Sequence, residues 1–348
     1  MFADEEEFAR YCDLFPTDHS VQSYVRWLAI IQWDRKPWVD KQVLHRRSEH
    51  LKTFRALKSL ILRGITNGSM QGYGPVEALA EGFETIAPQT KTMKLVQWKV
   101  SPITLIEFIC RFPSLDNLVV EDMHYVVGLQ DRKHPFRSPR FAGRFRFTDS
   151  KGRGPSEKFL CLLSRLPLGF REISIDVGFS GAPDPIIMIL EKCSPVLVKA
   201  RLYYGYHPGM ATAFLSFYGR IVNQSSTTVT NFLGSTIREI NASFPELREL
   251  TLRPDVEDAG IVDDLALKLL SVISSPHLSH VTLDHTVPHS FDQTETNKWR
   301  EVDRTMFKLT QRIGRKVSFS WHFPHEVTDV ERVVRPWKEL TVWELCVS

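Results

Sequence analysis

The amino-acid sequence predicts an α/β fold in which a parallel β-sheet is built from a repeated helix–strand unit. The first observation is a spacing, apolar-x-x-apolar-x-apolar, which is clearest in FPSLDNLVVEDM (112–123) and FPELRELTLRPD (244–255). The second is that segments with apolar residues every three or four positions precede most copies, as amphipathic helices require. Helices that alternate with strands give parallel sheets, and a repeat of this length gives a curved solenoid.

Eight copies of this spacing predict strands. Their apolar positions are Val25/Leu28/Ile30, Leu57/Leu60/Leu62, Met93/Val96/Trp98, Leu115/Leu118/Val120, Phe170/Ile173/Ile175, Leu197/Ala200/Leu202, Leu247/Leu250/Leu252 and Leu278/Val281/Leu283. Two weaker copies follow, at Val317 and Phe319 and at Leu340, Trp343 and Leu345. Because side chains alternate along a strand, the residues between the apolar positions are expected to face away from the core.

Helices are predicted before five of the strands, and a proline follows each helical segment. The segments are ITLIEFICRF (103–112), SEKFLCLLSRL (156–166), PIIMILEKCS (185–194), NFLGSTIREINASF (231–244) and LALKLLSVIS (265–274). The prolines are Pro113, Pro167, Pro195, Pro245 and Pro276. Proline ends a helix because it has no N–H for the hydrogen-bond ladder. The repeating unit is therefore a helix, a proline-marked turn, a short strand and a loop.

The prediction is one solenoid over residues 1–348, with residues 1–24 as an N-terminal cap or remnant and residues 131–154 as a basic insertion loop. Between residues 131 and 153 there are eight Lys or Arg and two Asp, and phenylalanines alternate with the arginines. The favoured interpretation is that the phenylalanines pack on the core while the arginines face water. Two alternatives are an acidic protein partner and a nucleic acid, since arginines with aromatic residues bind phosphates and stack on bases. The arginines concerned are Arg137, Arg140, Arg144 and Arg146.

Composition indicates the cellular location of the protein but does not identify a specific function. The formal net charge of +3 is close to balance, which does not favour a nucleic-acid or membrane-surface protein. Five widely spaced cysteines with no Cys-x-x-Cys indicate a reducing compartment. The acidic N-terminus has no hydrophobic signal core, and no apolar run approaches the roughly 18 residues that cross a bilayer. We therefore expect a cytoplasmic or nuclear protein that does not act at a membrane.

The sequence lacks the common motifs for catalysis and cofactor binding. It has no Gly-x-Gly-x-x-Gly, Walker-type phosphate loop, Gly-x-Ser-x-Gly or His-Glu-x-x-His. The close histidine pairs lack the third and fourth ligands that zinc needs; they are His277/His280, His285/His289 and His322/His325. We therefore expect no enzyme activity, no cofactor and no metal site.

The repeats resemble the irregular leucine-rich repeats of fungal F-box proteins. The resemblance is carried by SYVRWLAIIQW (23–33), the two stretches quoted first, SSPHLSHVTLD (274–284) and DVERVVRPW (329–337). Regular repeats of this family place Asn or Cys three residues after the last Leu, whereas this chain has Ile65, Met123, Asp255 and Thr286 there. In addition, the 24 residues before Val25 do not resemble an F-box.

The resemblance implies a protein-binding module, the substrate-recognition part of an SCF-type ubiquitin ligase receptor, which holds an unidentified protein target without chemistry of its own. A ligase adaptor would be a partner if an F-box lay upstream. The alternatives are a repeat scaffold with no ubiquitin role, and an acidic-ligand or nucleic-acid binder acting through residues 132–153. Repeat solenoids bind on the concave sheet face. By strand alternation its partner-binding residues would be Trp27, Arg63, Lys99, Glu121, Asp176, Tyr203, Arg253 and Asp284.

Overall fold

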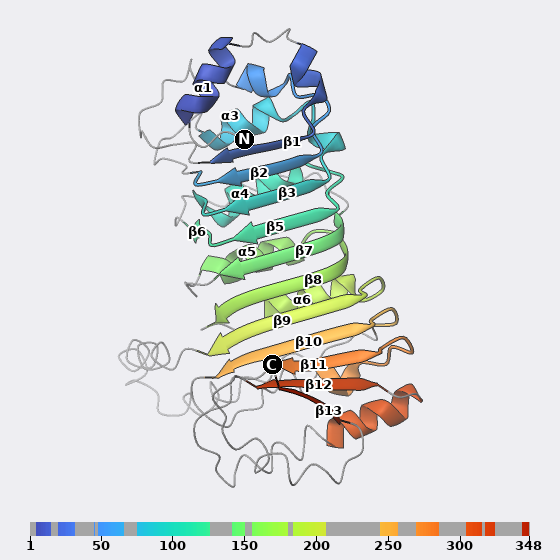
Figure 1. Cartoon of the computed structure of the whole chain (residues 1–348). Coiled ribbons are helices and arrows are strands. Elements are labelled where there is room, and N and C mark those ends of the chain that lie inside the picture. Colours follow the sequence, from blue (N-terminus) through green and yellow to red (C-terminus); the bar gives the residue numbers. More distant parts are fainter. Residues whose placement is uncertain are drawn as a thin grey trace, which may run out of the picture. The chain divides into compact units, whose positions relative to one another are not determined.

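The computed structural model in Figure 1 divides the chain into two compact units, one of residues 1–149 and 155–170 and one of residues 150–154 and 171–348. The structure describes residues 5–14, 20–31, 45, 48–65, 75–125, 141–149, 155–179, 184–206, 244–256, 269–284, 304–314, 317–323 and 343–347.

The first unit contains parallel strands in the order β1-β2-β3-β5-β7. These strands are β1 (Trp27–Ile31), β2 (Ser59–Arg63), β3 (Thr92–Val96), β5 (Asn117–Glu121) and β7 (Phe141–Asp149). A separate parallel pair is formed by β4 (Lys99–Val100) and β6 (His124–Tyr125). The helical elements are α1 (Glu5–Leu14), η1 (Ser20–Tyr24), α3 (Pro75–Gly82), η2 (Ala87–Gln89), α4 (Pro102–Cys110) and α5 (Pro155–Ser164).

The second unit continues the same alternation, with strands in the order β8-β9-β10-β11-β12-β13. They are β8 (Leu168–Phe179, whose first three residues belong to the first unit), β9 (Lys199–Tyr206), β10 (Glu249–Val256), β11 (His280–Asp284), β12 (Ser318–Phe323) and β13 (Trp343–Val347). Helix α6 (Asp184–Cys193) precedes β9, and residues 269–272 and 304–313 are also helical. The predicted α/β class with a parallel sheet is therefore confirmed.

Strand register in the first unit is set by two rows of buried apolar side chains. The rows are Leu28–Leu60–Met93–Leu118–Phe145 and Ile30–Leu62–Leu95–Val120–Phe147. The predicted core pairs of β1, β2 and β5 are confirmed. In β3 the predicted positions Val96 and Trp98 are wrong, because Leu95 is the core residue that pairs with Leu62. Val96 lies on the other side of the strand, and Trp98 follows its end.

The second unit has two register-aligned apolar rows, which are buried on β8, β9 and β10. They are Ile173–Ala200–Leu250–Val281–Phe319–Trp343 and Ile175–Leu202–Leu252–Leu283–Trp321–Leu345. The two weak C-terminal copies of the spacing therefore correspond to paired strands, with Phe319 opposite Trp343. A one-residue slip would turn every core side chain to the opposite side of the sheet, so these rows fix the register.

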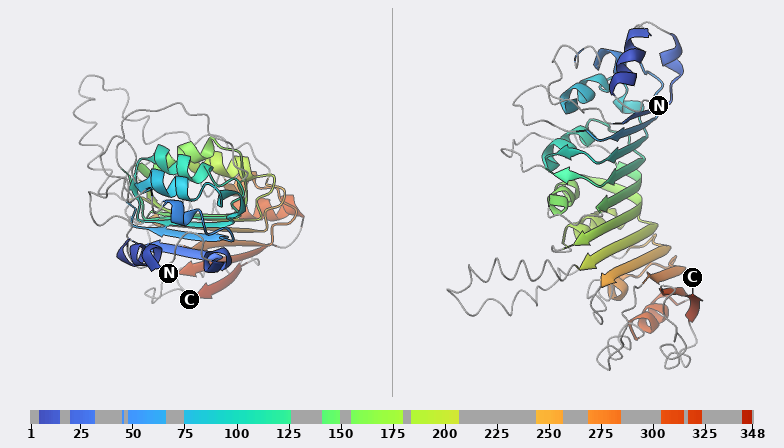
Figure 2. Two further views of the ribbon diagram at one scale, coloured as in Figure 1. Left: turned by 90° about the horizontal axis from the view of Figure 1, so that it is seen from above. Right: turned by 60° about the vertical axis from the view of Figure 1, so that its left-hand side comes forward.

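Helices α3, α4 and α5 of the first unit lie on one side of its strands, and α6 lies on one side of the strands of the second unit (Figure 2). Helix α4 begins where Ser101 Oγ accepts a hydrogen bond from the Thr104 N–H at 3.1 Å, with Pro102 in the first turn. Its inner face is buried, and Phe108 packs against Phe112 with ring centroids 5.4 Å apart. The predicted helices at 103–112, 156–166 and 185–194 correspond to α4, α5 and α6. The predicted helix 231–244 lies almost wholly outside the described residues.

The predicted basic insertion loop is partly wrong, since residues 141–149 form strand β7. Phe141, Phe145 and Phe147 alternate along it and are buried, whereas Arg144 and Arg146 are exposed. The phenylalanines pack on the core and the arginines face water, as the favoured interpretation expected. The rest of the segment, including Arg137 and Arg140, lies outside the described residues.

Three strands of the first unit end in the same turn. The residue after each strand has a left-handed backbone, namely Gly64 (φ 72°), Gln97 (φ 56°) and Asp122 (φ 50°). The next residues, Ile65, Trp98 and Met123, are buried. They occupy the position where regular leucine-rich repeats carry Asn or Cys. The indole Nε1 of Trp98 donates a hydrogen bond to the Leu62 carbonyl at 3.1 Å, so an aromatic side chain links two neighbouring strands here.

A search of the described residues for membrane-spanning helices gives a negative result. None of the helices among them combines the length and the apolar character needed to cross a bilayer.

Candidate functional site

The candidate site is the open face, defined as the side of the strands that the helices do not cover. In the first unit it consists of three rows, Trp27–Ser59–Thr92–Asn117–Arg144, Ala29–Ile61–Lys94–Val119–Arg146 and Ile31–Arg63–Val96–Glu121–Thr148. The strands present this side toward the viewer in Figure 1, and the view from above in Figure 2 shows the helices on the other side. Polar and charged residues predominate in these rows, in contrast to the two core rows.

A main-chain hydrogen-bond ladder joins the beginnings of the strands. The Arg26 carbonyl accepts from the N–H groups of Lys58 and Ser59 at 2.9 and 3.0 Å. The Lys58 carbonyl accepts in the same way from Lys91 and Thr92, also at 2.9 and 3.0 Å. The second unit repeats the pattern, since the Arg248 carbonyl accepts from Ser279 and His280. The residue before each strand is thereby held directly next to its counterpart on the neighbouring strand.

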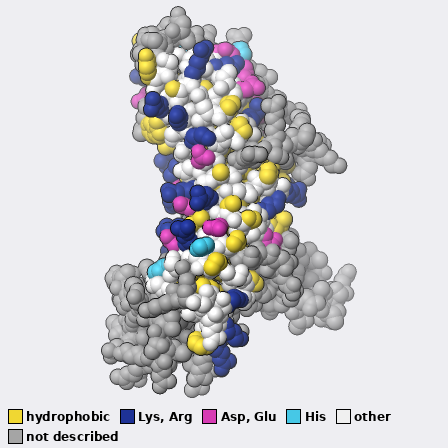
Figure 3. Space-filling view, turned by 90° about the vertical axis from the view of Figure 1, so that its right-hand side faces the viewer, with side chains coloured by type: hydrophobic (Ala, Val, Ile, Leu, Met, Phe, Trp, Pro, Cys, Tyr) yellow, Lys and Arg dark blue, Asp and Glu magenta, His cyan; other side chains and the backbone are white. Residues whose placement is uncertain are grey.

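This ladder places three basic residues side by side at the strand beginnings, and we call Arg26, Lys58 and Lys91 the basic ladder. All three are exposed. The row ends at Asp116, whose carboxylate lies 3.6 Å from the Lys91 ammonium, with both side chains about half exposed. Viewed from the side where the strands begin, Lys and Arg side chains gather along this edge, with acidic side chains between them (Figure 3).

Farther along the open face, Glu121 lies between two bases from neighbouring strands. Its carboxylate is 2.7 Å from the Lys94 ammonium and 4.0 Å from Arg146 Nε. Arg63, in the same row as Glu121, donates to the side-chain oxygen of Gln97 at 3.2 Å. Glu121 therefore compensates part of the positive charge at the centre of this face, where Lys94, Arg146 and Arg63 lie on neighbouring strands.

The open face of the second unit alternates in charge. Glu172, Lys199 and Glu249 occupy one row on three successive strands, and Lys199 forms an ion pair with Glu249. In another row the Arg253 guanidinium lies 5.8 Å from the centroid of the Tyr203 ring, a cation–π distance. Opposite charges on adjacent strands stabilise the sheet.

The structure brings most of the predicted partner-binding residues onto the open face. Trp27 is 42% exposed on β1, and Arg63 and Glu121 share one row of the first unit. In the second unit Asp176, Tyr203 and Arg253 are aligned on the consecutive strands β8, β9 and β10. Asp284 is the last residue of β11, which pairs with β10. The side chain of Asp284 is outside the described part of the chain.

Lys99 was wrongly placed on this face. The turn at Gln97 ends β3 early, so Val96 occupies the expected position and Lys99 lies in β4, which pairs with β6. Sequence reasoning also missed the basic ladder. Its signal was a base directly before each strand core, as in RWLAI, KSLIL and KTMKL.

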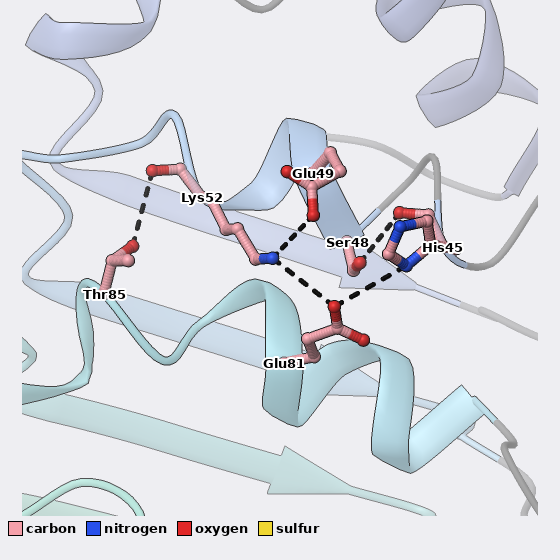
Figure 4. A network of polar contacts seen from close by, with 6 residues as sticks. All are labelled: His45, Ser48, Glu49, Lys52, Glu81 and Thr85. Carbon is pink, nitrogen blue, oxygen red and sulfur yellow. Dashed lines mark hydrogen bonds and ion pairs between the residues drawn. The ribbon is translucent and has the colours of Figure 1, made fainter.

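A second polar cluster lies on the helical side of the first unit, where Lys52 contacts Glu49 at 2.6 Å and Glu81 at 3.4 Å (Figure 4). His45 Nδ1 lies 3.5 Å from the same Glu81 carboxylate. The hydrogen bond to Glu49 is the main cause that raises the pKa of Lys52, so the ammonium stays charged. One ligand atom each from His45, Glu49 and Glu81 lie within 4.8 Å of one another. Because Lys52 already pairs with both carboxylates, a cation would have to displace it, and we assign no metal site here.

Cys110, Cys161 and Cys193 are free thiols, and Cys110 and Cys193 are buried. Burial, with a smaller contribution from Glu107, raises the pKa of Cys110 to about 12. Its thiol is therefore protonated at neutral pH and is not a reactive nucleophile.

Comparison with known proteins gives no relative for this chain. No protein-family model matches it, and neither the curated proteins nor the solved structures contain a match.

Proposed function

We propose that the chain is a non-catalytic protein-binding module made of irregular leucine-rich repeats, and that its open face binds a protein target. The observation that carries this proposal is that the two sides of the strands differ in the chemical character of their side chains. Apolar rows and helices occupy one side, while register-aligned charged, polar and aromatic side chains occupy the other. Exposed Trp, Tyr and Arg residues are enriched where proteins meet.

The finer proposal follows from the family resemblance. In it, the chain is the substrate-recognition part of an SCF-type ubiquitin ligase receptor that acts in the cytoplasm or nucleus. The rival within the same class is a repeat scaffold that holds a partner without marking it for ubiquitination. The two differ in one measurable quantity, because deleting the chain lengthens the half-life of a ligase substrate and leaves that of a scaffold partner unchanged.

A nucleic-acid function through residues 132–153 is less well supported. Phe141, Phe145 and Phe147 are buried against the core, where Phe145 stacks on Phe170 at 5.2 Å. These three rings are therefore not available to stack on bases, which is the contact that single-stranded nucleic acids require.

The proposal is tested by site-specific photo-crosslinking in the source cells. A photoreactive residue is placed at Ile61 or Thr251 on the open face, and at the exposed Lys158 or Lys192 on helices α5 and α6 as matched controls. We expect at least one of the open-face positions to capture a protein that the helix position of the same unit does not. Capture from the helix positions alone would contradict the open-face proposal.

A further inference from the structure

We infer that the basic ladder formed by Arg26, Lys58 and Lys91 binds an acidic segment of a protein partner. This inference rests on the proposed protein-binding function and adds the chemistry of the partner. It also identifies a surface outside the predicted partner-binding residues, because the ladder lies at the strand beginnings.

The first argument is geometric. Main-chain hydrogen bonds of 2.9 Å from the Lys58 N–H to the Arg26 carbonyl, and from the Lys91 N–H to the Lys58 carbonyl, make these residues direct neighbours. Strands in a sheet are spaced by about 4.8 Å, so three positive side chains leave the sheet edge at that interval. The spacing is set by the backbone and does not depend on the side chains themselves.

The second argument is electrostatic. Lys91 pairs with Asp116 at 3.6 Å, whereas Arg26 and Lys58 have no ion-pair partner among the residues that the structure describes. Like charges on directly adjacent strands repel and destabilise a sheet. An anionic ligand would remove this repulsion, so the ladder is electrostatically complementary to a row of carboxylates.

The residues that follow the ladder positions are polar on three of the four strands. Ser59, Thr92 and Asn117 follow the ladder positions on successive strands and are half-buried, while Trp27 is exposed at the end of the row. Hydroxyl and amide groups donate hydrogen bonds to carboxylates and peptide carbonyls. Carboxylates on one face of an acidic helix or strand are about 5–7 Å apart, a separation that flexible Lys and Arg side chains can match.

The composition of the site favours a protein over a nucleic acid. Stacking needs an aromatic platform for successive bases, and Trp27 is the one aromatic side chain in the row beside the ladder. Asp116 at the end of the ladder would repel a phosphate that continued along the strand beginnings. A short acidic peptide segment can stop before Asp116.

The test measures binding of labelled probes by fluorescence anisotropy. The probes are a short peptide of alternating Glu and Ser, its counterpart of alternating Lys and Ser, and a short thymidine oligonucleotide. The variant Arg26→Gln/Lys58→Gln/Lys91→Gln is compared with Arg111→Gln/Lys158→Gln/Lys308→Gln, which removes three exposed bases elsewhere. Circular dichroism and urea unfolding verify that both variants remain folded.

We expect the parent protein and the control variant to bind the acidic peptide equally, and the ladder variant to bind it about tenfold more weakly. Binding should weaken as ionic strength rises. Equal binding by the ladder variant, tighter binding of the oligonucleotide than of the acidic peptide, or no binding of the acidic peptide at low salt would each overturn the inference. If the proposed open-face function were correct and only the ladder inference were wrong, the open-face crosslinks would persist in all three cases. Failure of the ladder inference is therefore distinguishable from failure of the proposed function.

Discussion

Three strands of the first unit, β2, β3 and β5, end differently from three strands of the second, β8, β9 and β10, although their core rows follow the same spacing. In the first unit β2, β3 and β5 are five residues long and are each followed by a residue with a left-handed backbone. In the second unit β8, β9 and β10 continue for 12, 8 and 8 residues. The apolar spacing therefore determines where a strand forms in this chain, and a different feature determines where it ends.

The difference in strand length follows from the residue that lies two positions after the second core residue of each strand. The first unit has Gly64, Gln97 and Asp122 there, which are left-handed, whereas the second has Val177, Tyr204 and Pro254 in continuing strands. Branched or bulky side chains resist a left-handed backbone, and the proline ring excludes it. The next position holds the buried Ile65, Trp98 and Met123 in the first unit, but Gly178, Gly205 and Asp255 in the second. A strand therefore ends where the chain can turn and has an apolar side chain to bury.

The largest expected effect comes from removing the buried anchor at Trp98. We expect Trp98→Ala to lower the free energy of unfolding by about 3–5 kcal/mol, because the side chain is fully buried and leaves a cavity. Trp98→Phe keeps an aromatic ring but leaves the Leu62 carbonyl without its indole donor, and should cost about 1–2 kcal/mol. Urea unfolding measures both.

Trp27→Ala is the matched control, since it removes the same side chain from an exposed position of β1. It should change the free energy of unfolding by less than about 1 kcal/mol. If Trp98→Ala were no more destabilising than Trp27→Ala, the buried anchor would not be what ends the strands of the first unit.

A smaller effect is expected at two left-handed glycines, one in each unit. An added Cβ at Gly143 (φ 73°) would lie 2.0 Å from the Asp116 carbonyl oxygen, while one at Gly314 (φ 70°) would meet nothing within 4 Å. Gly314→Ala should cost about 1 kcal/mol from backbone strain alone, and Gly143→Ala about 3 kcal/mol because β7 must also move away from β5. Thermal unfolding of the two variants measures the difference. Equal losses would mean that close approach at Gly143 contributes nothing beyond its φ angle.

The sequence predicted the strand cores well because buried apolar side chains determine them. Leu28 and Ile30, and likewise Leu118 and Val120, were identified from spacing alone and pair as expected. Strand β7 was missed altogether, because its phenylalanines alternate with arginines and the segment was interpreted as a basic loop. Lys99 was misplaced because the left-handed turn at Gln97 has no strong sequence signal.

The open face was predictable in outline and not in detail. Alternation along a strand identifies which residues face away from the core, but not which charges meet across strands. The ion pair of Lys94 with Glu121 joins residues of β3 and β5 and depends on the true register of β3. The network of His45, Glu49 and Glu81 likewise joins segments far apart in the chain.

The smallest expected effect comes from removing one surface lysine in each unit, which should change the free energy of unfolding in opposite directions. Lys58→Gln in the basic ladder should raise the free energy of unfolding by about 0.2–0.5 kcal/mol, because it removes repulsion from Arg26 and Lys91. Lys199→Gln in the second unit should lower it by about 0.2–1 kcal/mol, because it removes the ion pair with Glu249. Urea midpoints at low and high salt measure both, and high salt should abolish the two effects. A loss of stability in Lys58→Gln would mean that the folded chain already compensates the ladder charge, which would remove the electrostatic reason for an acidic partner there.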